Sequence, residues 1–250
     1  MLEVAGLIKR FGGFTAVSDV SFKVDQGEIL GLIGPNGSGK STIFNMLSGT
    51  FAPTAGSIRF QGREIGGSAP HRIIHCGIGR TFQIPRPFKR LSIFENVVLA
   101  GFYGSEGTTR SSSFAAAERA LTMVGLPADR AAPVSSLGAA GLKKLELAKA
   151  LATEPKLLLA DESLGGLDEA EMEQAAEMLR NIRRELGITI IWVEHIMGVL
   201  MRVVDRVMVL DHGEKIAEGL PHQVAADPRV IEVYLGSDAA ATQAYAAERV

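Results

Sequence analysis

One short glycine-rich segment constrains the fold of this chain more than any other feature. Gly34-Pro35-Asn36-Gly37-Ser38-Gly39-Lys40-Ser41 fits the pattern G-x-x-x-x-G-K-[ST]. It follows an apolar run at residues 28–33, which is typical of a strand buried on both faces, and it precedes a helical pattern at about residues 41–47. Strand, loop and helix in this order predict a phosphate-binding loop. A glycine-rich turn with a surface lysine is the alternative that this context disfavours.

The residues of this loop have separate roles in holding phosphate. The glycines let the backbone curl so that N–H groups and the helix N-terminus point at the β-phosphate. Lys40 neutralises the β- and γ-phosphates, and the Ser41 hydroxyl is placed for Mg²⁺. The expected nucleotide contacts are Gly34, Asn36, Gly37, Ser38, Gly39, Lys40, Ser41 and Thr42.

Two adjacent carboxylates end another apolar run. Asp161 and Glu162 follow residues 157–160, and ligands of open parallel sheets bind beyond the carboxyl ends of the strands. Successive side chains of an extended segment face different ways, so Asp161 can reach Mg²⁺ while Glu162 orients or deprotonates the attacking water. His195 ends the next run, from which it can reach the γ-phosphate. Alone, such a pair is usually a solvated turn and such a histidine is usually structural, but the upstream loop favours the catalytic interpretation.

Size and charge narrow the class of protein. At 250 residues and 26.6 kDa the chain can bury a full core as one domain. The sequence contains no apolar run long enough to span a bilayer, and its first residues lack the pattern of a secretory leader, which predicts the cytosol. A net charge of −2 leaves no global basic surface, so no nucleic-acid partner is expected. The single cysteine, Cys76, cannot form an internal disulfide.

Hydrophobic patterning predicts the rest of the organisation. Alternation at residues 20–24 predicts a small antiparallel β region, and apolar runs separated by an amphipathic stretch predict a parallel α/β sheet. We expect helices at 93–100, 114–124 and 142–151, a loop at 101–113 and an edge strand at 215–219. The expected domain covers residues 1–236, with a helical subdomain inserted at about 85–151, and a loosely held tail at 237–250 follows it.

The order of these motifs resembles the ATP-binding-cassette (ABC) family over nearly the whole chain. Gln83, in Gly79-Arg80-Thr81-Phe82-Gln83, falls between the phosphate loop and the helical insertion, and Asp168 and His195 follow the two carboxylates. The resemblance implies an α/β fold, with a P-loop NTPase core built on a mixed or parallel sheet, an N-terminal antiparallel β subdomain and an inserted α-helical subdomain. It also implies that the chain hydrolyses ATP with Mg²⁺ and works as a dimer.

The same resemblance assigns roles to single residues. It implies catalytic groups at Glu162, His195 and Gln83, and metal contacts at Ser41, Gln83 and Asp161. Asp168 matches the aspartate that crosses the dimer interface. Phe11 matches the aromatic residue that stacks on adenine, although Phe14 is an alternative and Phe11 can instead be a core residue.

The resemblance breaks at one motif. The family's Leu-Ser-Gly-Gly-Gln aligns with Leu137-Gly138-Ala139-Ala140-Gly141, so Gly138 and Ala140 are expected at the nucleotide held by the other subunit. Losing the serine hydroxyl costs about 1.5–3 kcal/mol, roughly ten- to a hundredfold in affinity, while backbone donors and the helix N-terminus remain. Ser136 substitutes for it if the register shifts. A working but weakly self-associating ATPase is expected. Ser163 also stands where the family usually has proline.

Residues 77–83, 88–97 and 216–236 resemble the ATPases of branched-chain and related hydrophobic amino-acid importers. This implies integral-membrane permease subunits, a second ABC ATPase subunit that is identical or related, and indirectly a periplasmic binding protein. It places the chain on the cytoplasmic face of the inner membrane. Ile84, Pro85, Pro87 and Phe88 are expected to line the permease docking groove, or alternatively to form a proline-bent loop packed on the core.

Three other functions are compatible with parts of this pattern. Lipopolysaccharide-export ATPases share much of the same pattern. A soluble cassette protein that acts on ribosomes or in DNA repair is disfavoured, because such proteins usually carry two cassettes or a long coiled-coil insertion. A P-loop kinase or GTPase leaves Gln83, Asp168 and His195 unexplained.

Overall fold

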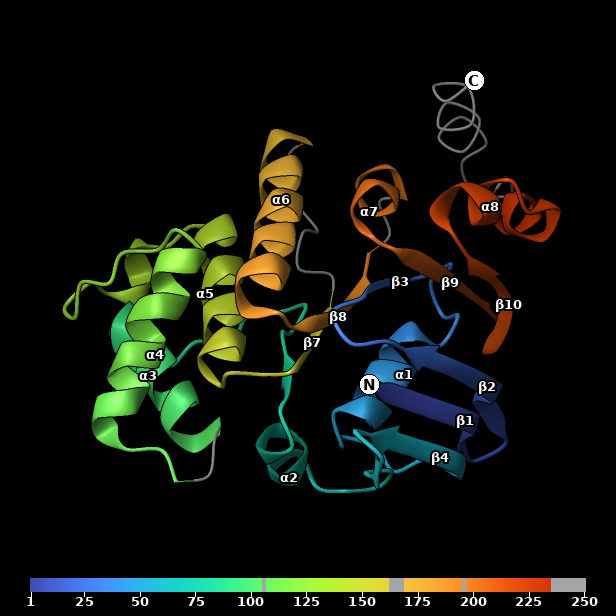
Figure 1. Ribbon diagram of the computed structural model, residues 1–250, viewed down its shortest axis with the longest axis horizontal. Coiled ribbons are helices and arrows are strands. Elements are labelled where there is room, and N and C mark those ends of the chain that lie inside the picture. The colour runs from blue at the N-terminus through green and yellow to red at the C-terminus, as the bar shows by residue number, and fades with distance from the viewer. Residues whose placement is uncertain (105–106, 162–168, 195–196, 235–250) are drawn as a thin grey trace. The chain divides into compact units, whose positions relative to one another are not determined.

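The computed structural model describes residues 1–104, 107–161, 169–194 and 197–234, which fall into two compact units (Figure 1). Met1–Ser68 and the chain from Ile191 onward form the first unit, and Ala69–Ile190 form the second. The phosphate loop therefore belongs to the first unit, whereas Gln83 and Asp161 belong to the second.

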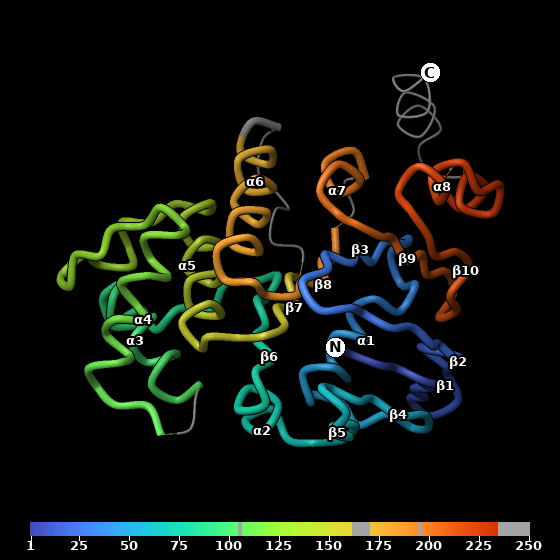
Figure 2. Tube along the Cα trace, in the orientation of Figure 1, coloured from blue at the N-terminus to red at the C-terminus, as the bar shows by residue number. Residues whose placement is uncertain are grey.

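An antiparallel sheet opens the first unit and confirms the expected β region. Its strand order is β2-β1-β4-β5 (Figure 2). The strands are β1 (Leu2–Phe11), β2 (Phe14–Val24), β4 (Ala55–Phe60) and β5 (Arg63–Glu64). Val4 of β1 pairs with Phe22 on one side and with Ile58 on the other. Buried and exposed residues alternate along the end of β2, because one face of the sheet packs on the core and the other meets water.

The strand that precedes the phosphate loop is buried along its whole length, as its apolar run predicts. The elements around it are β3 (Ile29–Ile33), α1 (Lys40–Leu47), α7 (Met197–Val203), β9 (Arg206–Asp211), β10 (Glu214–Gly219) and α8 (Pro221–Ala225). β3 runs parallel to β9, and β10 joins β9 in the antiparallel direction, which makes this sheet mixed. A side chain at Gly31 would come within 2.7 Å of Leu200, so the glycine lets α7 pack closely on β3.

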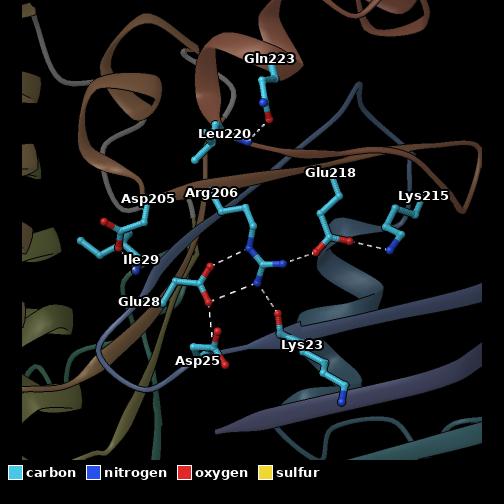
Figure 3. A network of polar contacts seen from close by, with 10 residues as sticks. All are labelled: Lys23, Asp25, Glu28, Ile29, Asp205, Arg206, Lys215, Glu218, Leu220 and Gln223. Atoms are coloured by element: carbon cyan, nitrogen blue, oxygen red, sulfur yellow. Dashed lines mark hydrogen bonds and ion pairs between the residues drawn. The ribbon is translucent and has the colours of Figure 1, made fainter.

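A charged network anchors the start of β3 (Figure 3). Arg206, the first residue of β9, donates hydrogen bonds to Glu28 and Glu218. The Glu28 hydrogen bond also raises the pKa of Arg206 above its already high ordinary value, so the guanidinium stays charged. Asp205 accepts a hydrogen bond of 2.8 Å from the backbone N–H of Ile29. Together these contacts join the turn before β3 to β9 and β10.

Helices make up most of the second unit. Its elements are α2 (Pro70–His75), β6 (Ile78–Arg80), α3 (Ile93–Gly104), α4 (Arg110–Met123), η1 (Val134–Ser136), α5 (Ala139–Ala152), β7 (Leu157–Asp161) and α6 (Glu169–Leu186), while β8 (Thr189–Val193) runs across the boundary between the units. α3, α4 and α5 pack against one another and bury Phe94, Leu121 and Leu145. β6 and β7 are parallel. In the described ranges, no helix combines the length and hydropathy needed to cross a membrane.

Residues 101–113 differ from the expected loop. α3 continues to Gly104, and α4 already begins at Arg110. Thr109 and Ser112 form a capping box, in which the Thr109 side chain accepts a hydrogen bond from the Ser112 N–H and the Ser112 hydroxyl accepts one from the Thr109 N–H. The serines that suggested a loop are therefore part of a helix start.

Candidate functional site

The phosphate loop has two positions that only glycine can occupy. Gly34 and Gly39 have φ values of +149° and +104°, which L side chains rarely adopt. A side chain at Gly34 would come within 2.1 Å of the carbonyl oxygen of Leu210, and one at Gly39 within 2.7 Å of that of Ala16. The motif glycines are therefore required both by the backbone conformation and by the close approach of neighbouring strands.

Lys40, the first residue of α1, is buried against this loop. Its ammonium group donates hydrogen bonds to the main-chain oxygens of Gly34 (2.6 Å) and Pro35 (2.9 Å) and lies 3.5 Å from the Ser38 hydroxyl. These acceptors are neutral, so they solvate the buried charge without cancelling it. Around it Asn36, Gly37 and Ser41 are exposed, and Thr42 is half-buried. An anionic phosphate matches both this charge and the N-terminus of α1.

Tyr234, which no sequence motif signalled, lies beside the first glycine of the loop. Burial raises the pKa of its hydroxyl well above the usual range, and the charge of Asp211 acts in the same direction. The nearby backbone of Gly34 opposes this shift. Tyr234 therefore supports the phosphate loop, although no local sequence motif points to this residue.

Phe11 lies at the end of β1 and is not a core residue. Its ring is 43% exposed and meets the Phe51 ring edge to face, with 5.3 Å between the centroids. The Lys9 ammonium lies 5.0 Å from the centroid of the Phe11 ring. Phe14, the alternative, is more exposed still. Phe11 thus offers an aromatic ring on a surface where a planar base can stack.

In the second unit, Asp161 ends β7 and is held by residues at the end of the neighbouring strand. The Arg80 guanidinium donates a hydrogen bond of 2.7 Å from Nη2 to Asp161 Oδ2. The backbone N–H of Asp161 donates to the Thr81 hydroxyl at 3.0 Å. Gln83 follows two residues later and is exposed. Sequence reasoning expected Asp161 and Gln83 near one another but missed Arg80, because nothing in the motif pairs an arginine with this carboxylate.

Three expected site residues, Glu162, Asp168 and His195, lie outside the described residues. Their roles remain those that the sequence predicts. The strand that leads to His195 is β8, which is buried along its length as expected.

The degenerate signature segment forms the start of α5. Gly138 is the N-cap residue, with φ of −74° and ψ of −175°, and no side chain caps the helix. Ser136 ends η1, and its hydroxyl donates a hydrogen bond of 2.7 Å to the main-chain oxygen of Pro133. The Ser136 hydroxyl is therefore already used in a hydrogen bond within its own turn. Ala140 lies in the first turn of α5.

The segment 84–88 exposes apolar side chains. Its backbone is hydrogen-bonded to side chains of α3 and α5. Ile84 is 70% and Phe88 53% exposed. Glu146 of α5 accepts a hydrogen bond from the Arg86 N–H, and Asn96 of α3 both accepts from the N–H of Phe88 and donates to its carbonyl oxygen. The alternative of a loop packed on the core is therefore wrong for Ile84 and Phe88. Glu146 and Asn96 could have been suspected as polar residues inside apolar helical patterns.

A pocket of about 230 Å³ lies in the same unit. Its lining includes Phe82, Tyr103, Glu146 and Lys149. Tyr103 is exposed, and Lys149 pairs with Glu146 at 2.7 Å. The second unit thus has a pocket, lined in part by aromatic side chains, beside the segment that leads to Gln83.

Comparison with known sequences agrees with these features. The family described as ABC transporter matches residues 17–165, and that described as branched-chain amino acid ATP-binding cassette transporter matches residues 214–240. The high-affinity branched-chain amino acid transport ATP-binding protein BraF of Pseudomonas aeruginosa is 36% identical over 249 residues, which cover 94% of this chain and 98% of BraF. LivG of Escherichia coli, named for the same transport, is 35% identical over 251 residues, with the same coverage.

Solved structures agree in the same way. An ATP-binding cassette of an ABC transporter in its ADP conformation superimposes with a TM-score of 0.85 at 29% identity, covering 95% of this chain and 99% of that one. A dimeric cassette in a post-hydrolysis state with ADP and Pi has a TM-score of 0.78 at 25% identity, covering 88% and 99%. The family match covers more than half of the residues, and its motifs are those that form the phosphate loop and β7. The chain therefore belongs to the ABC transporter family and is an ATP-binding cassette that hydrolyses ATP to power transport.

Proposed function

We propose that this cassette powers the import of branched-chain or related hydrophobic amino acids. The observation that carries the proposal is the second family match, at residues 214–240, which lies beyond the general cassette match. It begins at β10 and includes α8, so it concerns a part of the chain outside the phosphate loop. The relatives BraF and LivG are named for branched-chain amino acid transport and support the same substrate class.

ATP binds in this proposal between the phosphate loop and Phe11. Lys40 balances the charge of the phosphates, the loop N–H groups bind their oxygens, and the exposed ring of Phe11 stacks on adenine. Glu162 orients or deprotonates the attacking water, and His195 binds the γ-phosphate. The burial of Lys40 against the loop and its hydrogen bonds to Gly34 and Pro35 support the phosphate position.

Mg²⁺ fits the residues proposed to hold it. Ser41, Gln83 and Asp161 all offer oxygen donors, which are the ligands that this ion prefers. The carboxylate of Asp161 already accommodates a positive charge, that of Arg80, at the end of a buried strand. When bound, the ion supplies positive charge that balances the phosphate oxygens.

A second cassette, identical or related, completes each site in this proposal. Gly138 and Ala140 at the start of α5, together with Asp168, face the nucleotide held by the other subunit. The dimeric cassette among the similar structures supports such a pairing. Gly138, the N-cap residue of α5, has no hydroxyl, so the start of this helix offers a phosphate only backbone N–H donors.

Permease subunits dock on residues 84–88 in this proposal and place the cassette on the cytoplasmic face of the inner membrane. The support is that Ile84 and Phe88 are exposed although their backbone is fixed by hydrogen bonds to α3 and α5. Apolar side chains on a rigid backbone suit a permanent apolar partner surface. A periplasmic binding protein then delivers the amino acid to the permeases and has no direct contact with this chain.

The test replaces the native gene with variants and measures uptake of radiolabelled leucine, isoleucine and valine by the host. Lys40→Ala should abolish uptake. Phe88→Asp should abolish uptake while the purified chain keeps its ATPase activity, because only docking is disturbed. Leu186→Asp is the matched control, since Leu186 is also an exposed apolar residue but lies far along the chain from residues 84–88.

Co-purification from detergent-solubilised host membranes supplies the second arm of the test. Two permease-type proteins and a second cassette should accompany the chain. Uptake of branched-chain amino acids that is indifferent to Lys40→Ala would refute the substrate class, and a wholly soluble set of partners would refute the role in transport.

A further inference from the structure

The ion pair between Arg80 and Asp161 is buried, in contrast with most of the ion pairs that the structure describes in the second unit. The two side chains are 10% and 7% exposed. By comparison, Arg119 and Glu154 form a pair whose side chains are 59% and 65% exposed. Burying two charges is costly, and one of these two is the carboxylate proposed for the metal. We therefore expect Arg80 to have a role beyond stabilising the fold.

Contacts between the ends of β6 and β7 fix the positions of Arg80 and Asp161. Arg80 pairs in register with Leu159, and the Thr81 N–H donates to the carbonyl oxygen of Leu159 at 3.0 Å. The Thr81 hydroxyl in turn accepts from the N–H of Asp161. The ends of β6 and β7 are thus joined by main-chain and side-chain contacts, which leaves the Asp161 carboxylate little freedom to turn.

Phe82 also contacts the Arg80 guanidinium. The Arg80 guanidinium carbon lies 5.1 Å from the centroid of the Phe82 ring, a cation–π contact. Phe82 also lines the 230 Å³ pocket. The Arg80 guanidinium therefore contacts both an aromatic ring and the carboxylate, and a lysine cannot reproduce its planar, multi-nitrogen group.

We propose that Arg80 is a positioning residue that holds Asp161 through Oδ2 and shares its negative charge with the incoming metal ion. The inference rests on the proposed role of Asp161 at Mg²⁺. Two effects follow from it. Arg80 orients the carboxylate for hydrolysis, and its positive charge weakens the attraction between Asp161 and the metal. Removing Arg80 should therefore tighten metal binding and slow hydrolysis at the same time.

The experiment measures two quantities on the purified full chain. One is the affinity for Mn²⁺ of the chain saturated with a non-hydrolysable ATP analogue, followed by the electron paramagnetic resonance signal of unbound Mn²⁺. The other is kcat for ATP with Mg²⁺. For Arg80→Gln, the Kd for Mn²⁺ should fall by about threefold or more, because a competing cation is lost. The kcat should fall by about tenfold or more, because the carboxylate loses its orientation.

Arg80→Lys keeps the charge and so protects the fold if Arg80→Gln does not fold. It should change both quantities in the same directions by roughly a third as much on a logarithmic scale, because a lysine ammonium lacks the two-nitrogen fork and holds its charge less closely against Asp161 than the guanidinium does. Arg119→Gln, which removes an exposed arginine of the same unit, should change neither. A general packing role predicts weaker metal binding with slower hydrolysis. Unchanged or weaker Mn²⁺ binding in the Arg80 variants would therefore overturn the inference.

Asp161→Asn separates this inference from the function on which it rests. If this variant binds Mn²⁺ as tightly as the wild type, the proposed metal role of Asp161 is wrong. If it weakens Mn²⁺ binding while the Arg80 variants do not tighten it, only the role of Arg80 is wrong.

Discussion

Lys40 in the first unit and Asp161 in the second are both buried charges of the proposed ATP site, but they are stabilised in different ways. Lys40 donates to Gly34 and Pro35, which are six and five residues away, and both acceptors are neutral. Asp161 accepts from Arg80, which is 81 residues away and carries the opposite charge. The hydrogen bonds to Gly34 and Pro35 bring no opposite charge to Lys40, whereas the ion pair with Arg80 brings one to Asp161.

This difference teaches where a sequence motif is informative. A partner inside the motif is specified by the same short segment, so spacing alone reveals it. A partner from another strand depends on register and sheet topology, which single-sequence patterns specify poorly. Substitutions that remove or add local and distant partners can therefore test whether the contrast holds.

Lys40→Ala should have the largest effect. The phosphates lose a positive charge that no neighbouring side chain of the loop replaces, so ATPase activity should fall by about 100- to 1000-fold. The fold should persist, because the hydrogen-bond acceptors lost at Gly34 and Pro35 are neutral main-chain oxygens. Steady-state phosphate release measures the effect, and Lys23→Ala, which removes a mostly exposed lysine of the same unit, is the control. Activity near that of the wild type would place the phosphates elsewhere.

Gly138→Ser adds a local partner where the signature lacks one. Gly138 has the extended backbone of an N-cap, and a side chain there meets nothing within 4 Å, so serine fits. In a Glu162→Gln background that blocks hydrolysis, its hydroxyl should tighten ATP-dependent dimerisation by about ten- to a hundredfold. Sedimentation with and without ATP measures this change.

Ala139→Ser is the matched control for Gly138→Ser, because it adds the same hydroxyl one residue further along α5. It should leave dimerisation nearly unchanged. Strong dimerisation of the parent Glu162→Gln chain at low micromolar concentration would contradict the expectation that the degenerate signature weakens self-association.

The phosphate loop and its flanking elements were predictable from the sequence. The expected strand at residues 28–33 and helix at 41–47 correspond to β3 (Ile29–Ile33) and α1 (Lys40–Leu47) within one residue. The pattern works because glycine positions, apolar strand and helix are consecutive, and each meets its physical requirement within a few residues. The conformations at Gly34 and Gly39 are those that the motif requires.

Other features could not be predicted, for two physical reasons. Arg80 meets Asp161 only because β6 and β7 are adjacent and in a particular register, which the sequence does not state. The helix start at Thr109 was mistaken for a loop, because serine and threonine favour both turns and N-caps. In both cases the residue type was compatible with two structures, and tertiary context or capping geometry selected between them.

Arg206→Met removes a distant partner that serves the fold rather than the ligand (Figure 3). Arg206 bonds Glu28, which is 178 residues away, and also Glu218. Both carboxylates lose a mostly buried cation, so the free energy of unfolding should fall by about 2 kcal/mol. Urea denaturation measures it, and Arg59→Met, at an exposed pair with Glu64, should change it by less than about 0.5 kcal/mol. Equal losses in the two variants would show that burial of the network adds nothing.

Asp227→Asn removes only the charge of a local pair and should have the smallest effect. Asp227 accepts hydrogen bonds from the side chain and the backbone N–H of Arg229, which lower the pKa of the carboxyl below its ordinary 3.8. A lowered pKa means that the ionised form stabilises the fold above pH 3.8, and that this contribution disappears as pH falls through the lower folded-state value. Asparagine keeps the ability to accept from the Arg229 N–H. The melting temperatures of the two proteins should therefore differ slightly at pH 7 and converge in strong acid. A large difference at pH 7 would mean that a local exposed charge can matter as much as a distant buried one, and the contrast between Lys40 and Asp161 would lose its generality.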